Sequence, residues 1–323
     1  MDGVLVVDKP AGPTSHDIVA RARRLVGEPR VGHTGTLDPA ASGVLPLVMG
    51  RATRLARFFA AAEKSYEAII RLGYATDTDD AEGVPGPVSP GPLPGRADIE
   101  EALAAFRGAF EQRPPVYSAK RVAGRRSHRV ARAAARPGAP ARARAALAAH
   151  TADLAPVRVR VDRLDLVDIH GADVTVTLTC SAGFYVRALA RDLGERLGVG
   201  GHLIGLRRTR SGEFRVDDAL AWDAVERDPA LAAAALTPMS RLLLHVPAVT
   251  LTPEGVRHAC HGRDLTPADL RAGGGDGAQQ PDQRAGAGEG DAWVRLLAPD
   301  GSLVGLARRV RAPGLLHPSV VLR

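Results

Sequence analysis

The sequence predicts an α+β protein with a mixed domain over residues 1–243 and a small β-rich domain over 244–323. Apolar and polar side chains alternate over 157–166 and again over 174–180, which is the period of a β-strand. Over 184–197 the apolar side chains recur at helical spacing, and a glycine follows the last of them. Both kinds of element therefore occur within the first domain.

The first elements follow in chain order. An apolar run at 4–7, before Asp-Lys-Pro, predicts a strand and a turn. Thr14 or Ser15 is expected to cap the helix that comes next. Residues 31–50 are rich in Gly, Thr and Pro and predict a structured loop, and 66–73 predicts the following strand.

The remaining segments differ strongly in composition. Residues 83–96 are rich in Pro and Gly and predict a loop, and a capping box opens a helix over 98–110. An Ala/Arg-rich segment at 131–155 predicts a polar-faced helix or a mobile insertion, and the Gly-rich segment at 271–291 predicts a disordered linker. Short strands are expected near 293–297, 303–307 and 320–322.

The chain is basic, and its charge is unevenly distributed. Its 323 residues include 43 basic and 36 acidic side chains, for a formal net charge of +7. Arginine, which binds phosphate in a bidentate way, accounts for nearly all the cations, although a genome that favours Arg and Ala would give the same bias. Nine cations and no acidic residue fall within 119–144. This basic block indicates a polyanionic partner, either nucleic acid or a membrane surface.

Composition also excludes several classes of protein. Cys180 and Cys260 are the only cysteines, so neither a disulfide framework nor a four-cysteine zinc site is possible, and we expect a reducing cytosol. The first residues lack the pattern of a signal peptide, and no apolar run is long enough to span a membrane. We therefore expect a cytoplasmic protein.

Two clusters carry side chains that could perform chemistry. In GHTGTLDPAASGVLP (32–46), Pro39 keeps Asp38 out of the helical conformation, and Asp38 is either a helix cap followed by proline or a loop carboxylate poised for reaction. The cluster His258-x-Cys260-His261 lacks a fourth ligand and the usual paired spacing, so we expect no metal there.

The segment around Asp38 closely resembles the catalytic signature of the TruB family of tRNA pseudouridine synthases. Five other segments resemble that family in its usual order, and together they span nearly all of residues 1–220. These segments are DKPAGPTSHD (8–17), KSYEAIIRLGYATDTDDAEG (64–83), PPVYSAKRVAGRR (114–126), CSAGFYVRALARDLGE (180–195) and GHLIGLRRTRSGEF (201–214).

The resemblance implies the pseudouridine synthase fold, with a mixed, mostly antiparallel central sheet flanked by helices. Residues 244–323 are weakly similar to a PUA-like RNA-binding module. The implied reaction isomerises uridine to pseudouridine in the T-loop of tRNA, at position 55, after the base has flipped out of the folded RNA. It involves no redox step or hydrolysis, so no cofactor or metal is expected.

The resemblance also implies the catalytic residues. Asp38 would be the catalytic carboxylate, acting as a nucleophile on the base or sugar, or as a base at the sugar. An ionised carboxylate in a largely dry pocket needs a fixed cation beside it, and Arg187 matches the arginine that pairs with it in the family. Tyr66 would stack on the target base and assist proton transfer with its hydroxyl.

Further residues would bind the substrate. Tyr185 would pack against the ring, His33 would occupy the space left by flipped bases, and Leu206 would line the uracil pocket. The candidates for phosphate contacts are Lys9, Arg54, Arg207 and Arg208.

The partner implied is tRNA, bound at its T-loop and T-stem. A monomer with no membrane and no obligatory protein partner is expected. A guide-RNA-dependent relative acting within a protein–RNA complex and a non-enzymatic RNA-binding protein are the alternatives. Three features depart from the family pattern: His128 in place of a common aromatic, the 131–155 segment and the 271–291 segment.

Overall fold

The computed structural model describes residues 1–117, 121–122, 125–126, 154–271, 292–310 and 314–323. Nearly all of the predicted insertion at 131–155 and of the predicted linker at 271–291 lies outside the described residues, as does most of the basic block at 119–144. By contacts between residues, the chain divides into two compact units, each of which is described separately below.

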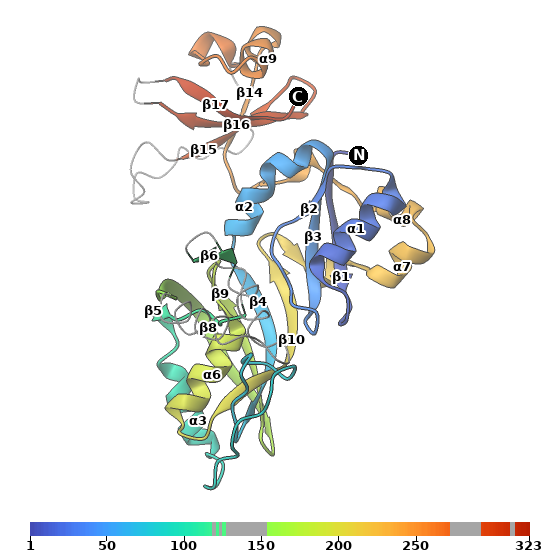
Figure 1. The fold of residues 1–323 in the computed structure, drawn as a ribbon. Coiled ribbons are helices and arrows are strands. Elements are labelled where there is room, and N and C mark those ends of the chain that lie inside the picture. The colour runs from blue at the N-terminus through green and yellow to red at the C-terminus, as the bar shows by residue number, and fades with distance from the viewer. Residues whose placement is uncertain (118–120, 123–124, 127–153, 272–291, 311–313) are drawn as a thin grey trace. The chain divides into compact units, whose positions relative to one another are not determined.

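The second unit comprises Asp38–Val44 and Ala61–Val216. Its long strands form successive antiparallel pairs, and two helices pack on the sheet that they make (Figure 1). The strands are β4 (Lys64–Leu72), β5 (Gly108–Gln112), β6 (Arg121–Val122), β7 (Arg125–Arg126), β8 (Val157–His170), β9 (Asp173–Cys180), β10 (Gly201–Ser211) and β11 (Phe214–Arg215), and the helices are α3 (Arg96–Ala104) and α6 (Val186–Arg196).

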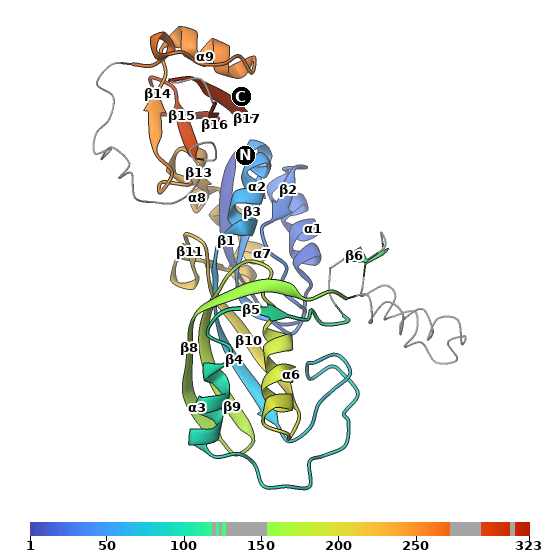
Figure 2. The ribbon, with the colours of Figure 1, turned by 90° about the vertical axis from the view of Figure 1, so that its left-hand side faces the viewer.

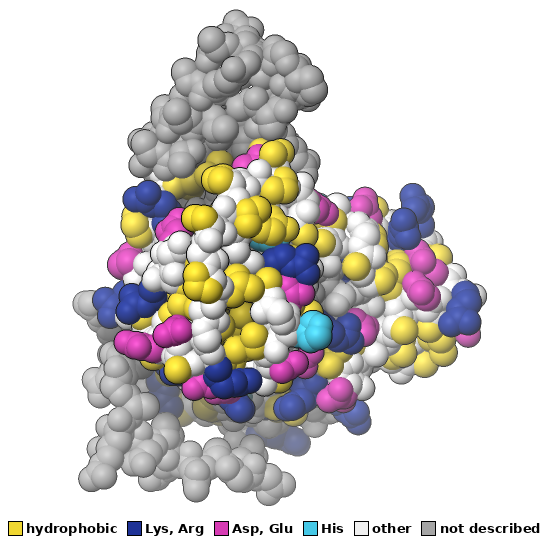
Figure 3. Space-filling model, turned by 90° about the horizontal axis from the view of Figure 1, so that it is seen from below, with side chains coloured by type: hydrophobic (Ala, Val, Ile, Leu, Met, Phe, Trp, Pro, Cys, Tyr) yellow, Lys and Arg dark blue, Asp and Glu magenta, His cyan; other side chains and the backbone are white. Residues whose placement is uncertain are grey.

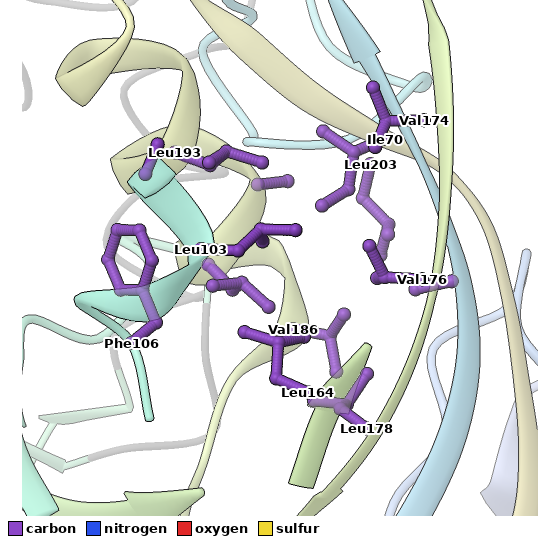
Figure 4. Packing of buried hydrophobic residues seen from close by; sticks show 14 of the residues in the cluster. Ile70, Leu103, Phe106, Leu164, Val174, Val176, Leu178, Val186, Leu193 and Leu203 are labelled. Carbon is purple, nitrogen blue, oxygen red and sulfur yellow. The ribbon is translucent and has the colours of Figure 1, made fainter. Parts of the chain in front are cut away.

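The core of the second unit lies between these helices and one face of the sheet (Figures 2 and 4). Leu103 of α3 and Leu193 of α6 meet Ile70 of β4 and Val176 of β9, and all four side chains are fully buried. Truncating such a leucine to alanine typically costs about 2–5 kcal/mol of stability. The helices and the sheet therefore hold one another in place.

The face of the structure seen in Figure 3 carries charges of both signs. In the view of Figure 3, Lys and Arg side chains alternate with Asp and Glu, and hydrophobic side chains lie between them. Among the described residues of this face, no sign of charge gathers into a single patch. The face therefore lacks the one-signed surface that a polyanion favours.

The first unit comprises Met1–Leu37, Leu45–Ala60 and Asp217–Arg323. Its N-terminal helix begins at the N-cap Thr14, whose hydroxyl accepts from the Asp17 N–H at 3.0 Å. Its first elements are β1 (Gly3–Lys9), α1 (Ser15–Val26), β2 (Val31–His33), β3 (Ser42–Met49), whose first residues belong to the second unit, the 3-10 helix η1 (Gly50–Leu55) and α2 (Ala56–Ala61).

The C-terminal part of the first unit contains a separate small sheet, with the strand order β14-β15-β16-β17. Helix α9 packs with it around buried apolar side chains such as Leu251 and Leu296. The elements of this part are η2 (Val216–Asp218), β12 (Leu220–Ala221), α7 (Trp222–Arg227), α8 (Ala230–Ala234), β13 (Thr237–Pro238), η3 (Met239–Arg241), β14 (Ala248–Thr250), α9 (Pro253–Cys260), η4 (Pro267–Asp269), β15 (Trp293–Leu297), β16 (Leu303–Arg309) and β17 (Leu316–Val321).

The large sheet has the strand order β12-β1-β3-β10-β4-β9-β8-β5. Strand β3 runs parallel to β10, and β1 runs parallel to β12. From β10 to β5 each strand is antiparallel to the next. This confirms the expected mixed, mostly antiparallel sheet with a separate small C-terminal sheet. The boundary expected near residue 243 stays a prediction.

Two expectations about elements are wrong. Residues 42–49, expected within a loop, form β3, because Val44, Leu45, Leu47, Val48 and Met49 are buried whichever face they point to. The helix expected over 98–110 begins at Arg96 and ends at Ala104, because Gly108 turns the chain with a φ of 78° into β5. Among the described residues, no helix is long and apolar enough to cross a membrane.

Candidate active site

The loop between β2 and β3 carries Asp38. The Asp38 carbonyl accepts a hydrogen bond from the Ala41 N–H at 3.1 Å, which closes a turn that leads directly into β3. No helix follows, so the alternative that Asp38 caps one is wrong. Just before it, the buried Ser15 hydroxyl donates to the Leu37 carbonyl at 3.0 Å and accepts from the Leu37 N–H at 2.9 Å.

Arg187 forms an ion pair with Asp38. Its Nε lies 3.0 Å from Asp38 Oδ2, and the Arg187 side chain is 9% exposed whereas that of Asp38 is 45% exposed. The same guanidinium donates to the carbonyl oxygens of Tyr117 at 2.8 Å and Thr78 at 3.2 Å, and lies 3.4 Å from Asp80 Oδ2. A buried, fully bonded cation thus faces a carboxylate that solvent, and hence a ligand, can reach.

A buried amide fixes the start of the helix that carries Arg187. The backbone N–H of Tyr185, the N-cap of α6, donates to Gln112 Oε1 at 2.9 Å, and Gln112 Nε2 donates to the Tyr185 carbonyl at 3.1 Å. Gln112 is 1% exposed, so both bonds are shielded from water. Sequence reasoning missed Gln112, and its one signal is an amide two residues before the segment PPVYSAK, which begins at Pro114.

The loop after β4 also supplies Asp79, whose carboxylate pairs with Arg191 of α6. Leu203 N–H donates to the Asp79 carbonyl at 3.0 Å, which ties this loop to β10. The Asp79 carboxylate lies 3.1 Å from Arg191 of α6, and its backbone φ of 62° is unusual for a residue other than glycine. Burial raises the pKa of Asp79 to about 6, and the nearby Arg191 and Arg187 charges oppose that rise.

Tyr66 projects from β4, where its cross-strand neighbours are Arg208 of β10 and Leu178 of β9. Its hydroxyl makes a side-chain hydrogen bond with Arg208. Burial raises the pKa of Tyr66, Arg208 acts against that rise, and the negative charge of Asp38 adds to it. The Tyr66 hydroxyl therefore interacts electrostatically with both Arg208 and Asp38.

Other expected ligand-binding residues of the second unit lie nearby in the fold. Tyr185 is half-buried at the start of α6, directly before Val186 and Arg187. Leu206 of β10 is half-buried, pairs with Ala68 of β4 and packs against the core. Arg207 is half-buried, and its Nη1 donates to Ser42 Oγ at 3.4 Å.

His33 and Arg54 belong to the first unit. The His33 ring lies edge-on to His16 with the ring centroids 5.2 Å apart, and its Nδ1 accepts from the Gly35 N–H at 3.4 Å. The exposed Arg54 donates to the Val321 carbonyl. Both side chains therefore make these contacts with residues of the first unit.

Two of the four expected phosphate contacts are buried. Lys9 is 0% exposed, and its Nζ donates to the carbonyl oxygens of Pro10 and Pro13, both at 2.8 Å. Arg208 is 1% exposed. Both cations are therefore enclosed by protein in this structure, and the phosphate contacts expected of Lys9 and Arg208 stay a prediction.

The His258-x-Cys260-His261 cluster has protein partners. His258 Nδ1 lies 2.8 Å from Asp269 Oδ1, and its Nε2 lies 3.1 Å from Glu254 Oε1. His261 Nδ1 is 2.7 Å from the Arg257 carbonyl. The contact between His258 and Asp269 joins α9 to η4, and the other two lie within α9 or at its end.

Comparison with known proteins agrees with this architecture. The N-terminal domain of the TruB family pseudouridylate synthases matches residues 23–186, and the C-terminal domain of tRNA pseudouridylate synthase B matches residues 187–244. The tRNA pseudouridine synthase B of Mycobacterium sp. (strain KMS) is 40% identical, with 99% of this chain and 97% of that one covered. Those of Solibacter usitatus (38%, 100% and 100%) and Thermobifida fusca (42%, 99% and 98%) are similar.

Solved structures show the same fold. A chain in "Structure of H/ACA RNP bound to a substrate RNA containing 2'-deoxyuridine" superposes with a TM-score of 0.69 at 25% identity, covering 99% of this chain and 85% of that one. One in "Crystal Structure of a Cbf5-Nop10-Gar1 Complex" gives 0.68 at 26%, covering 100% and 85%. With both family domains matched in order and relatives about 40% identical over its whole length, the chain belongs to the TruB family of pseudouridylate synthases, isomerases that convert uridine to pseudouridine in tRNA.

Proposed function

We propose that this enzyme isomerises the uridine at position 55, in the T-loop of tRNA, with Asp38 as its catalytic carboxylate. In this reaction the bond between N1 and C1′ breaks, the base rotates, and C5 bonds to C1′. C5 then loses a proton and N1 gains one, so uridine and pseudouridine have the same composition. The reaction needs an ionised carboxylate, a surface for the base and a group that moves the proton.

The ion pair between Asp38 and Arg187 carries the proposal. A carboxylate entering a site closed by RNA loses its hydration, and a fixed cation offsets that loss. Arg187 is held by protein carbonyls as well as by Asp80, so it stays in place when a ligand covers Asp38. Either role open to Asp38, nucleophile on base or sugar or base at the sugar, depends on this charge.

The substrate-binding side chains support the same proposal. Tyr66 stacks on the flipped uracil, Tyr185 packs against it and Leu206 lines its pocket. A stacked base is typically worth about 1–3 kcal/mol. Flipping the base costs roughly a few kcal/mol, and His33 offsets part of that cost by filling the gap that the base leaves. Arg54 and Arg207 contact phosphates.

The test is incubation with an unmodified tRNA transcript, followed by mapping of pseudouridine through a chemical adduct and primer extension. Wild-type enzyme modifies the T-loop uridine, and Asp38→Asn loses turnover while it still binds tRNA. Asp217→Asn, at an exposed position outside the site, serves as the control and keeps full activity. An Asp38→Ala variant as active as the wild type would disprove the assignment.

A second candidate function is guide-RNA-dependent modification, because the solved neighbours come from H/ACA RNP and Cbf5-Nop10-Gar1 structures. The higher identity to proteins named tRNA pseudouridine synthase B favours direct action on tRNA. Turnover by purified enzyme without any guide distinguishes the two.

We further propose that the enzyme is cytoplasmic and works as a monomer without an obligatory protein partner. Measuring the size of the enzyme during catalysis tests whether it is a monomer and whether it acts without a partner.

A further inference from the structure

Ser15 is a buried residue whose hydroxyl binds the backbone directly before Asp38. It is the first residue of α1, and it is 0% exposed. Its Oγ donates to the Leu37 carbonyl at 3.0 Å and accepts from the Leu37 N–H at 2.9 Å. One hydroxyl can make both bonds because it has an O–H donor and lone pairs on its oxygen. A single side chain, shielded from water, therefore holds both polar groups of the Leu37 backbone.

These two bonds fix the peptide that leads into Asp38. The Leu37 carbonyl, the Asp38 nitrogen and the Asp38 Cα share one plane, because a peptide bond is planar. Holding the Leu37 carbonyl oxygen therefore sets the direction in which the chain enters Asp38. On the other side, the Asp38 carbonyl accepts from the Ala41 N–H at 3.1 Å. With its backbone held before and after, Asp38 moves its carboxylate chiefly by rotating the side chain between staggered rotamers.

The helix that carries Ser15 is itself firmly anchored. Its first turn has a capping box, in which the Asp17 N–H donates to Thr14 Oγ1 at 3.0 Å and the Thr14 N–H donates to Asp17 Oδ2 at 2.9 Å. Within the next turn, the fully buried Ile18 belongs to the same apolar core as Leu47 of β3. Ser15 is therefore placed by a capped and buried helix, which gives its hydroxyl a fixed position.

The loop between β2 and β3 depends on contacts of this kind, because it is not part of the sheet. It includes Gly35, whose φ of 149° is a backbone conformation that other residues rarely adopt. Next to Ser15 on α1, the His16 ring lies edge-on to the ring of His33, the last residue of β2, with the centroids 5.2 Å apart. Two consecutive residues of α1 thus contact the chain that leads to Asp38.

We propose that Ser15 is a positioning residue of the isomerisation, which acts through the Leu37 backbone. It keeps the Asp38 carboxylate against Arg187 Nε, at 3.0 Å, and within reach of the uridine. A reacting group that is fixed before the substrate arrives needs no ordering during the reaction, and a displacement of about 1 Å can lower the rate by about 10²-fold. The inference rests on the proposed function, because it takes Asp38 to be the catalytic carboxylate.

The test compares Ser15→Ala and Ser15→Cys with the wild type, in single-turnover assays with saturating enzyme on unmodified tRNA and in filter binding, well below the unfolding temperature of each variant. Ser15→Ala removes both bonds, and we expect its rate to fall by about 10²-fold because the carboxylate loses its fixed position. The affinity for tRNA stays near that of the wild type, since Ser15 is buried. Ser15→Cys keeps a weak donor and acceptor, so its rate lies between the two.

Thr252→Val is the matched control. The Thr252 hydroxyl also bonds the backbone twice, since it donates to the Asp269 carbonyl at 3.3 Å and accepts from the Gly255 N–H at 3.1 Å, but it does so at the start of α9. Thr252→Val should lose stability in denaturant unfolding, as Ser15→Ala does, and keep the wild-type rate. A loss of rate in Ser15→Ala alone supports the positioning role. An equal loss in Thr252→Val, or the wild-type rate in Ser15→Ala, overturns it.

Asp38→Asn in the same assay keeps the inference distinct from the proposed function. If Asp38→Asn turns over at the wild-type rate, the proposed function fails, and the inference fails with it. If Asp38→Asn is inactive and Ser15→Ala turns over at the wild-type rate, only the inference fails. Should Ser15→Ala not fold, as thermal unfolding would reveal, Ser15→Cys decides: a lower rate at unchanged tRNA affinity supports the inference, and the wild-type rate overturns it.

Discussion

Arg187 Nε lies 3.0 Å from Asp38 Oδ2, which joins a nearly buried guanidinium to a carboxylate that is almost half-exposed. The difference in exposure suits a site that a macromolecule closes. In the structure, solvent reaches one side of Asp38 and Arg187 supports the other. In the proposed function RNA displaces that water, and the cation remains because Tyr117, Thr78 and Asp80 also hold it.

Replacing Arg187 by methionine should abolish most activity and leave tRNA affinity largely intact. The change leaves Asp80 without its cation and Asp38 without its fixed partner. Removing one member of a buried ion pair typically lowers the stability of the fold by about 3–5 kcal/mol. Single-turnover kinetics and filter binding of tRNA measure the two effects separately.

The control is Arg187→Lys, which keeps the charge and loses the forked geometry that reaches Asp38, Thr78 and Tyr117 at once. We expect it to fold more stably than Arg187→Met and to remain slow. Wild-type turnover in Arg187→Lys would show that charge alone is sufficient, and wild-type turnover in Arg187→Met would remove Arg187 from the mechanism.

Replacing Gln112 by alanine should destabilise the enzyme by about 1–3 kcal/mol, because the Tyr185 N–H and carbonyl lose buried partners. Since these groups lie next to Arg187, turnover should also fall more than tRNA affinity does. Denaturant unfolding and kinetics measure both. The exposed neighbouring residue provides the control, Glu111→Ala, which should change neither. Equal stability of the two variants would contradict the anchoring role.

Asp79 should make stability depend on pH. Its pKa is raised from 3.8 to about 6 mainly by burial, so the folded enzyme prefers the neutral carboxyl. This contribution to the free energy of unfolding is fully present below pH 3.8 and is lost as the pH rises through about 6. Over that window the wild type should lose roughly 2–3 kcal/mol relative to Asp79→Asn, which cannot ionise. Denaturant unfolding across the pH series measures this, and parallel curves would refute it.

Much of the second unit was predictable, because several of its strands and helices are buried on one face. Burial on one face makes apolar side chains recur at a regular spacing in the sequence. The alternation at 174–180 gave β9, and the helical spacing after Phe184 gave α6, each within two residues of the observed bounds. Strand β10 was not predicted as a strand. It carries three arginines in a short run, and nothing local reveals that Arg208 turns inward while its neighbour Arg207 is only half-buried.

The site was predictable only in part, for a related reason. Asp38, Tyr66 and Arg187 were identified through resemblance, because a loop carboxylate and a helix arginine have no periodicity that reveals their partner. Gln112 escaped notice because its function depends on a contact with Tyr185, which is distant in sequence. The burial of Lys9 and Arg208 was not predicted, since a cation's burial depends on the packing of strands around it.

Replacing Gly43 by alanine should impair both stability and turnover. The added Cβ meets the Arg208 carbonyl oxygen at 2.2 Å and its nitrogen at 2.7 Å, so the parallel pairing of β3 with β10 must open. Gly108→Ala is the matched control, because its φ of 78° is also positive but nothing lies within 4 Å of the new Cβ. The control should lose only the stability that the left-handed backbone costs, roughly 1–2 kcal/mol.

Gly43→Ala should lose clearly more stability in denaturant unfolding. It should also slow the reaction, because the pairing holds Val44 against Arg208 and hence Arg208 against Tyr66. Equal losses in the two variants would mean that backbone strain alone accounts for the effect and that the close approach of β3 to β10 is not required.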